Sequence, residues 1–258
     1  MTPNMAANSE SSVASLYSNE AVAATYIKNR FSSSWGKLLH ASQVRQINHV
    51  IRDYQPHTII EIAPGPARIA VDLTGVRHGL MLDSSEEMLK LAKHRLASAG
   101  LESLWELHQH NAFDLESLHL QCDLLYSFRF IRHFDTSERA RLYQAIHGSL
   151  MPRGLFMLDV VNRHVRQRLD LKYGSPSEHG LKVFDATYSP EEFRHELTPY
   201  GFEVLSLTPV LRCFEIQSRI TYMIDHRLAT LANLAVHMLE RVPLQHPLEW
   251  VALCQKLS

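Results

Sequence analysis

Residues 58–68 read TIIEIAPGPAR, a β-branched run that ends in an acidic residue and passes into a loop of small residues. The run predicts a buried strand that ends near Ile62. In the loop, Gly65 is the residue that most readily adopts a positive φ or lets a ligand approach the main chain. We therefore predict a strand, a tight turn and a helix whose N-terminal N–H groups face a ligand.

Short apolar runs alternate with helical stripes through the centre of the chain. The apolar runs cover residues 80–82, 104–107, 123–128 and 155–161. Ser84 with Glu87, and Asp135 with Glu138, have the spacing of a capping box and predict where two helices begin. Strands that are apolar throughout favour parallel pairing with helices on both faces. The predicted fold class is therefore α/β, an open and mostly parallel sheet that binds ligands at the carboxyl ends of its strands.

A second acidic residue, Asp83, ends the second predicted strand. A carboxylate at this place can accept both hydroxyls of a ribose, so Asp83, Glu61 and the loop between them indicate a nucleoside site. A nicotinamide dehydrogenase is the less favoured alternative. Residues 63–70 hold one glycine, and Pro64 and Pro66 remove N–H groups that a pyrophosphate would use.

Over residues 55–160 the chain resembles the Rossmann-like, class I S-adenosylmethionine-dependent methyltransferases. That family places an acidic residue before alternating glycines, and residues 61–67 fit this pattern with Ala63 and Ala67 at the first and third glycine places. Residues 150–154, LMPRG, resemble the turn before the fifth strand, with Arg153 at one glycine place. The resemblance implies S-adenosyl-L-methionine as cofactor and S-adenosyl-L-homocysteine as product.

The resemblance also implies which residues bind the cofactor. Asp83 takes the place of the acid that holds the ribose, Met88 that of the residue beside the adenine, and Asn111 with Ala112 that of the pair that reads the adenine amino group. The full predicted set is Glu61, Ala63, Gly65, Asp83, Ser84, Met88, Asn111, Ala112 and Phe128.

Residues 127–134, SFRFIRHF, follow the fourth predicted strand, where an acceptor would meet the methyl group. Methyl transfer from a sulfonium needs alignment and exclusion of water, and it needs a general base only for a hydroxyl or a protonated amine. His133 is the candidate base, because an unperturbed histidine titrates near neutral pH. A structural role for His133 is the alternative.

Five residues are candidates for binding the acceptor: Tyr26, Arg30, Trp35, Arg129 and Arg132. The two arginines after the fourth strand could hold an acidic acceptor through paired N–H donors, or they could instead pair with Asp135 and Glu138. In the family, helices before the first strand often cover the site as a lid. Packing of these aromatic residues onto the sheet is the alternative.

We expect residues 1–15 to form a disordered tail and residues 16–54 a helical N-terminal lid. Residues 55–258 would form the methyltransferase domain, with insertions at about 163–188 and 212–246, the second of them helical. Residues 248–254 are expected to be the last strand, which the family inserts antiparallel, with a short helix as the alternative.

Composition limits the partners. The chain has 26 basic and 27 acidic residues and 45% hydrophobic residues, so no nucleic acid or membrane partner is expected, although local patches could still bind one. The three cysteines match no metal motif or disulfide framework. His108 and His110 could place both rings on one face of a strand and bind a metal, but no nearby cysteine or carboxylate completes the site, so a metal is disfavoured. No signal peptide is visible, so a cytoplasmic location is expected. The sequence leaves open whether the chain forms a homodimer.

The predicted function is transfer of a methyl group, by in-line displacement, to an oxygen or nitrogen of a small-molecule acceptor. Two alternatives remain. One is a catalytically silent methyltransferase-like subunit that acts through a protein partner, which the altered glycine places motivate. The other is an enzyme that keeps the cofactor but catalyses a rearrangement without methylation.

Overall fold

A computed structural model describes residues 31–174, 177–178, 181–182, 184–243 and 246–257. The predicted disordered tail, most of the helical region before residue 34, and the predicted acceptor residues Tyr26 and Arg30 lie outside the described residues. In the described part, no helix is long and apolar enough to cross a membrane.

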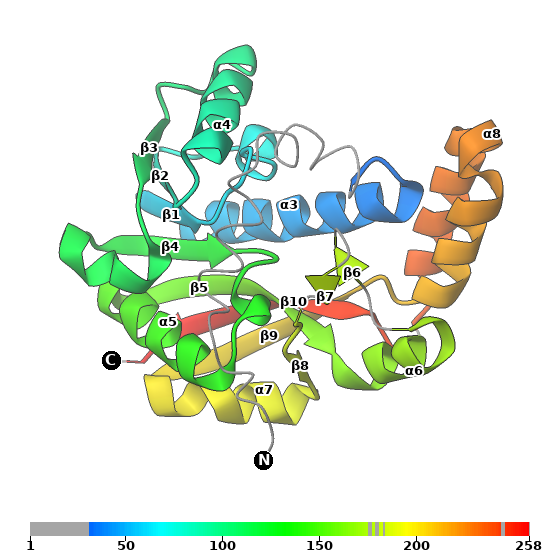
Figure 1. The fold of residues 1–258 in the computed structure, drawn as a ribbon. Coiled ribbons are helices and arrows are strands. Elements are labelled where there is room, and N and C mark those ends of the chain that lie inside the picture. Colours follow the sequence, from blue (N-terminus) through cyan, green and yellow to red (C-terminus); the bar gives the residue numbers. More distant parts are fainter. Residues whose placement is uncertain (1–30, 175–176, 179–180, 183, 244–245, 258) are drawn as a thin grey trace.

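The core of the structure is one mixed sheet with the strand order β3-β2-β1-β4-β5-β10-β9, to which β8 adds beside β5 (Figure 1). Its strands are β1 (Thr58–Ile62), β2 (His78–Asp83), β3 (Trp105–Gln109), β4 (Cys122–Ser127), β5 (Leu150–Asn162), β8 (Thr187–Tyr188), β9 (Phe202–Val210) and β10 (Glu249–Lys256). A separate hairpin pairs β6 (Ser177–Glu178) with β7 (Leu181–Lys182).

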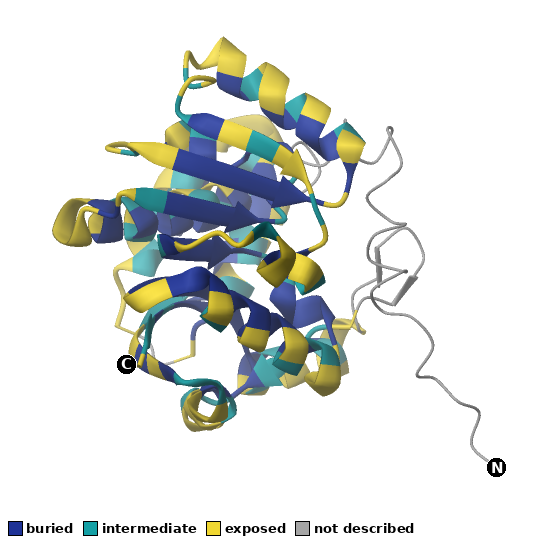
Figure 2. Ribbon diagram, turned by 90° about the vertical axis from the view of Figure 1, so that its left-hand side faces the viewer, coloured by how far each residue is buried: buried dark blue, intermediate teal, exposed yellow. Residues whose placement is uncertain are grey.

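Strands β1 to β5 pair in parallel, which confirms the predicted open α/β sheet. The chain runs from β1 outward to β2 and β3 and then crosses back to β4 on the other side of β1. The strand order therefore reverses between β1 and β4, and ligands of such sheets bind beside the carboxyl ends of these strands. Figure 2 shows the central strands buried along most of their length.

The last predicted segment is a strand and not a helix. β10 lies antiparallel between β5 and β9, and Trp250 and Ala252 are buried on one face of the sheet. Because β10 pairs with a strand on each side, its backbone N–H and C=O groups form hydrogen bonds within the sheet, although β10 is the last strand in the sequence.

Helices cover both faces of the sheet (Figure 1). They are α3 (Ser34–Tyr54), α4 (Glu86–Ser98), α5 (Thr136–Ser149), α6 (Arg163–Tyr173), α7 (Pro190–Leu197) and α8 (Phe214–Glu240). One core cluster holds side chains of α3, α4, α6 and α8, and the other holds side chains of α5 and α7. Helices α6 and α8 lie within the two predicted insertions.

The structure shows the N-caps of the two helices for which the sequence predicts a capping box. Asp135 caps α5 in a capping box with Glu138, as predicted. The predicted box from Ser84 to Glu87 is wrong by one residue, because the Ser85 hydroxyl accepts the Met88 N–H and begins α4. Ser84 is exposed just before this cap.

The helix predicted directly after the first strand is absent from the structure. Residues 63–77 form turns and a single 3-10 helix, η1 (Ala70–Asp72). Pro64 and Pro66 supply no N–H donors, and three residues between 63 and 67 have left-handed backbone. An uninterrupted right-handed helix therefore has no room to start in this loop. The buried face of α3, with Ile47 and Ile51, packs in the core cluster that also contains this loop.

Candidate functional site

The loop after β1 is tied to the end of β2 by hydrogen bonds. The Gly65 N–H donates to Asp83 Oδ2 at 3.0 Å, and the Ser85 N–H donates to Asp83 Oδ1 at 2.9 Å. The Ala63 N–H donates to the Leu82 carbonyl at 2.8 Å. A carboxylate oxygen accepts more than one hydrogen bond, so a fixed Asp83 can still receive hydroxyl donors.

Left-handed backbone recurs at alternate positions of this loop. Ala63 has φ 51°, Gly65 φ 55° and Ala67 φ 53°. Glycine adopts this conformation without penalty, and alanine does so at a cost. At Gly65 an added Cβ would have Met88 Sδ as its nearest neighbour, at 4.0 Å, so the main chain lies open there. The two alanines at glycine places therefore keep the backbone conformation that glycine favours.

Two buried carboxyl groups lie at the carboxyl ends of β1 and β2. Burial raises the pKa of Glu61 to about 7, although the Tyr126 hydroxyl, which donates to Glu61 Oε2 at 2.8 Å, and the Arg68 charge both oppose the shift. Burial also raises the pKa of Asp83 to about 6 against the two backbone N–H donors. Both acids thus change charge close to neutral pH.

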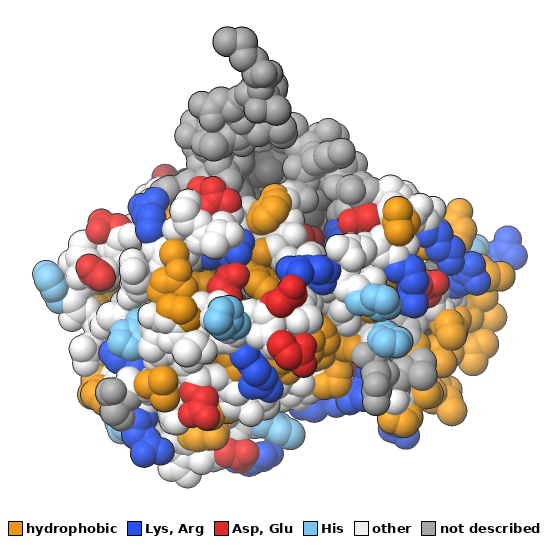
Figure 3. Space-filling view, turned by 90° about the horizontal axis from the view of Figure 1, so that it is seen from below, with side chains coloured by type: hydrophobic (Ala, Val, Ile, Leu, Met, Phe, Trp, Pro, Cys, Tyr) orange, Lys and Arg blue, Asp and Glu red, His pale blue; other side chains and the backbone are white. Residues whose placement is uncertain are grey.

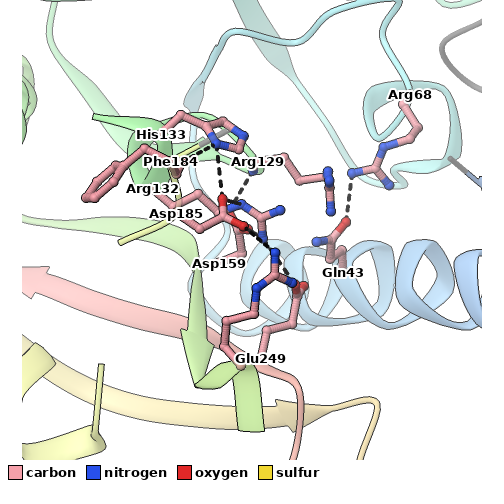
Figure 4. A network of polar contacts seen from close by, with 10 residues as sticks. Gln43, Arg68, Arg129, Arg132, His133, Asp159, Phe184, Asp185 and Glu249 are labelled. Atoms are coloured by element: carbon pink, nitrogen blue, oxygen red, sulfur yellow. Dashed lines mark hydrogen bonds and ion pairs between the residues drawn. The ribbon is translucent and has the colours of Figure 1, made fainter. Parts of the chain in front are cut away.

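A polar chain joins α3 to the loop. Arg68 donates to Gln43 Oε1 at 2.7 Å (Figure 4). It also donates to His40 Nδ1 at 2.9 Å. Because arginine only donates, His40 Nδ1 is the acceptor, and Nε2 carries the proton toward Asp72 Oδ2 at 2.8 Å. Burial and the Arg68 charge lower the pKa of His40. Arg68 also lies 4.0 Å from the centre of the Phe31 ring.

The residues predicted to lie beside an adenine gather next to the same strand ends. The His110 N–H donates to the Asp83 carbonyl at 3.0 Å, which brings the following residue, Asn111, next to the end of β2. Asn111 Oδ1 accepts the Phe113 N–H at 3.1 Å and caps η2 (Ala112–Leu118). Ala112, Met88 and Phe128 are buried, and Asn111 is exposed.

A cavity of about 150 Å³ lies beyond the end of β4. It brings together four predicted residues: Trp35, Arg129, Arg132 and His133. The rest of its lining is Leu39, Val161, Arg166, Asp185, Phe214, Leu248 and Glu249. Trp35 from α3 meets Phe214 from α8 edge-on, with ring centroids 5.6 Å apart. The lining therefore combines aromatic and aliphatic side chains with arginines and carboxylates.

His133 is buried with its two ring nitrogens in different settings (Figure 4). Nδ1 lies 3.0 Å from the Phe184 carbonyl oxygen and 3.1 Å from Asp185 Oδ1. Nε2 is buried and has no hydrogen-bond partner among the described residues. Two acceptors at Nδ1 place the proton of the neutral ring there, which leaves the Nε2 lone pair available to accept a proton.

Arg132 lies at the centre of an ion network. Its Nη1 is 2.8 Å from Asp159 Oδ2 and 3.3 Å from Glu249 Oε2, and its Nε is 3.1 Å from Asp185 Oδ1. The backbone N–H of Arg129 donates to the other oxygen of Asp159 at 2.6 Å. The carboxylate partners of Arg132 are therefore the protein's own.

The charges of this network follow from its contacts. Burial alone would raise the pKa of Asp185, but Arg132 and His133 outweigh it and hold this pKa well below its usual range. Burial and the Asp159 charge raise the pKa of Glu249 to about 7, against the opposing effect of Arg132. Asp185 is thus a permanent anion beside His133.

Three charged residues of the cavity lining are not predicted from the sequence. Arg166 belongs to α6 and Asp185 to the irregular stretch before β8, and no local pattern in the sequence marks either side chain as facing a cavity. Glu249 belongs to β10, and only the antiparallel register, which sets Glu249 opposite Val161, brings it to Arg132. A buried acid in an apolar strand is the one sequence signal that could have found Glu249.

Comparison with known proteins agrees with this arrangement. The family model described as "Methyltransferase domain" matches residues 59–154. Compared with curated proteins, the sequence has no significant match. Many solved structures share the fold.

Three solved structures illustrate the likeness. Magnesium protoporphyrin IX methyltransferase from Synechocystis PCC 6803 with bound S-adenosylhomocysteine has a TM-score of 0.66 at 9% identity, covering 96% of this chain and 99% of that one. Human N-acetylserotonin methyltransferase with S-adenosylmethionine has a TM-score of 0.63 at 11% identity, covering 97% of this chain and 60% of that one. A protein of Nostoc punctiforme PCC 73102, assigned provisionally as an O-methyltransferase, has a TM-score of 0.58 at 15% identity, covering 84% of this chain and 56% of that one.

Residues 59–154 therefore match a methyltransferase domain, and the fold around them is the one seen in the solved Rossmann-like methyltransferases. The chain spans little more than half the length of the Nostoc punctiforme and human proteins.

Proposed function

We propose that this enzyme transfers the methyl group of S-adenosylmethionine to an oxygen or nitrogen of a small-molecule acceptor, with His133 as general base. One observation carries the proposal. His133 holds Nδ1 against Asp185 and the Phe184 carbonyl, and its buried Nε2 has no partner among the described residues. A base oriented by a carboxylate, with its second nitrogen available, suits removal of a proton from a hydroxyl or an ammonium group.

The residues at the ends of β1 and β2 fit the cofactor. The open main chain at Gly65 and the fixed carboxylate of Asp83 are what a ribose and an amino-acid moiety require. When bound, S-adenosylmethionine supplies a methyl group already activated on a sulfonium, ready for in-line displacement. The residues that would hold it are Glu61, Ala63, Gly65, Asp83, Ser84, Met88, Asn111, Ala112 and Phe128.

The residues of the cavity divide the remaining work. His133 Nε2 takes the proton of the acceptor, and the Asp185 carboxylate stabilises the charged ring that results. Arg132 is a positioning residue, since it binds Asp185, Asp159 and Glu249. The Trp35 and Phe214 rings, which meet edge-on in the lining, would shield a bound acceptor from water.

The proposed acceptor is a small molecule, and the cavity of about 150 Å³ beside His133 supports this proposal. We assign Trp35 and Arg129 to acceptor binding, and Tyr26 and Arg30 stay predictions from sequence. Helix α3 would then serve as the described part of the predicted lid over residues 16–54. The neighbours named as small-molecule methyltransferases support an acceptor of this class.

The test is transfer of labelled methyl from S-adenosylmethionine to a panel of small phenols, alcohols and amines. With an acceptor found in this panel, His133→Gln should lower kcat by roughly 10²–10⁴-fold and leave the affinity for S-adenosylhomocysteine unchanged. Asp185→Asn should lower kcat less and shift its pH profile. His94→Gln, on the exposed face of α4, is the matched control and should behave like the wild type. Wild-type rates in His133→Gln would remove the general base from the proposal.

A further inference from the structure

We propose that α8 docks this protein onto an anionic lipid surface. The helix exposes an apolar face. Of the sixteen exposed large hydrophobic side chains among the described residues, seven lie on α8: Ile216, Tyr222, Met223, Leu228, Leu231, Leu234 and Met238. Tyr222 is 87% exposed and Met223 68%. Apolar side chains gathered on one exposed element mark an interaction site.

The outward face of α8 is distinct from the face that packs on the protein. Gln217, Thr221, Ala232 and Val236 are buried and form the inner stripe. The helix bends at Leu228, which has φ −137° and ψ 55°. Beyond this bend, Leu231, Leu234 and Met238 follow one another at helical spacing on the outer side. Since α8 already fills its place in the core, this second apolar face serves no packing role within the described residues.

The acidic side chains of α8 all bind groups of this chain. Asp225 accepts the Ser34 hydroxyl at 2.6 Å and the Ser34 N–H at 3.1 Å. Glu240 accepts the backbone N–H groups of residues 211 and 212, each at 3.0 Å. Glu215 pairs with arginine and lysine side chains of α6 at 2.7 and 3.2 Å. The carboxylates of α8 are therefore occupied by neighbouring elements.

The exposed charges of α8 are basic. Arg219 and Arg227 are exposed between the apolar side chains, and Arg241 is exposed directly after the last turn. Figure 3 shows orange side chains gathered with blue ones at the edge of the molecule that α8 forms. An outer face of apolar and cationic side chains matches an anionic lipid surface, which takes the apolar groups below its headgroups and the cations among them.

A second copy of the chain complements this face poorly, because it would present the same arginines and no unengaged carboxylate from α8. The proposal departs from the expectation of no membrane partner, which rested on the overall balance of charge rather than on one helix. It does not depend on the proposed methyl transfer. Phe214, the first residue of α8, lines the cavity, so a docked α8 would bring the cavity close to the lipid surface.

The test is co-sedimentation of the full chain with vesicles. Phosphatidylcholine vesicles are compared with vesicles in which part of this lipid is replaced by phosphatidylglycerol. We expect binding to the anionic vesicles, weakened at least tenfold by Arg219→Glu with Arg227→Glu, since each cation contributes about 1 kcal/mol. Leu231→Glu with Leu234→Glu should abolish binding. Leu205→Glu, on an exposed residue of β9, should bind as the wild type does. Added salt should weaken binding.

Two results would overturn the proposal. One is a wild-type chain that stays in solution with anionic vesicles. The other is a concentration-dependent dimer in light scattering that Leu231→Glu with Leu234→Glu dissociates, because a second copy would then cover the face. Equal thermal unfolding of wild type and variants verifies that a loss of vesicle binding comes from the surface and not from misfolding.

Discussion

Glu61 is a residue of the proposed cofactor site, and its ionisation also affects the stability of the fold. Its carboxyl lies at the end of β1, 4% exposed, with the Tyr126 hydroxyl as donor. Its pKa is about 7 in the folded chain and 4.5 when unperturbed. The folded state therefore binds more protons than the unfolded state between these two pH values, and Glu61 lowers stability progressively as pH rises through this range.

Replacing Glu61 by glutamine should remove this penalty. Glutamine keeps an acceptor for Tyr126 and carries no charge, so Glu61→Gln should gain about 2–3 kcal/mol of unfolding free energy over wild type near pH 8, and much less near pH 5. Urea unfolding of both proteins at the two pH values measures the difference. Glu203→Gln, at an exposed residue of β9, is the control and should leave the pH dependence unchanged. An identical pH dependence in wild type and Glu61→Gln would show that Glu61 ionises normally.

Arg153 tests whether left-handed backbone at a glycine place costs stability. It has φ 63° and an exposed side chain, so the backbone conformation, and not side-chain contacts, determines how a substitution at this position changes stability. Arg153→Gly should raise the unfolding free energy by about 0.5–1 kcal/mol, measured by denaturant unfolding. Met151→Gly, two residues earlier in β5 and outside the left-handed region, should lower it. Destabilisation by both changes would contradict the strain argument.

At the scale of elements, Arg132 connects segments that are far apart in sequence. It lies in η3 (Ile131–His133) and binds Asp159 of β5, Glu249 of β10 and Asp185 before β8. Removing a buried partner leaves carboxylates without compensation. The same contacts hold Asp185 beside His133, so the network serves both the fold and the proposed base.

Arg132→Met should lower the unfolding free energy by about 3 kcal/mol, because it strands several buried carboxylates. Arg166→Met is the matched control. Arg166 reaches Asp185 only at 3.4 Å and its side chain is 19% exposed, so its loss should cost less than about 1 kcal/mol. Chemical denaturation measures both values. Equal effects of the two changes would contradict the central position of Arg132.

The contact of α8 with α3 depends on Asp225. No acidic residue lies in the first turn of α3, and Asp225 supplies the missing anion from α8 by binding Ser34. A negative charge at a helix N-terminus stabilises the helix. Asp225→Asn should therefore cost about 1–2 kcal/mol in denaturant unfolding. Asp53→Asn, near the other end of α3 and exposed, should change stability by less than about 0.5 kcal/mol. A neutral Asp225→Asn would disprove this link.

Local sequence signals predicted those elements whose causes are local. The buried β-branched run of β1 and the capping box of α5 each depend on neighbours within a few residues. The helix expected after β1 was wrong because three left-handed residues and two prolines outweighed the strand–turn–helix pattern. Ser84 and Ser85 are adjacent and carry the same hydroxyl group, and only the structure distinguishes that Ser85 is the N-cap of α4.

At the scale of the whole molecule, the sheet decides which distant residues meet. Parallel pairing of β1 with β2 and β4 sets Glu61, Asp83 and the segment after Ser127 at one edge, and this could be predicted from the strand pattern. The contacts of His133 with Asp185, and of Arg132 with Glu249, could not be predicted. They depend on the path of an irregular segment and on the register of an antiparallel strand, which no local pattern encodes.

Calorimetric titration with S-adenosylhomocysteine tests the cofactor site at the ends of β1 and β2 most directly. We predict micromolar binding by the wild type, on the order of −8 kcal/mol. Asp83→Asn should weaken it at least tenfold, because its amide NH₂ would face the N–H of Gly65 or Ser85, each of which now donates to a carboxylate oxygen. Asp114→Asn, at an exposed acid of η2, should bind as the wild type does. Absence of binding by folded, ligand-free wild type, or unchanged binding by Asp83→Asn, would contradict the account.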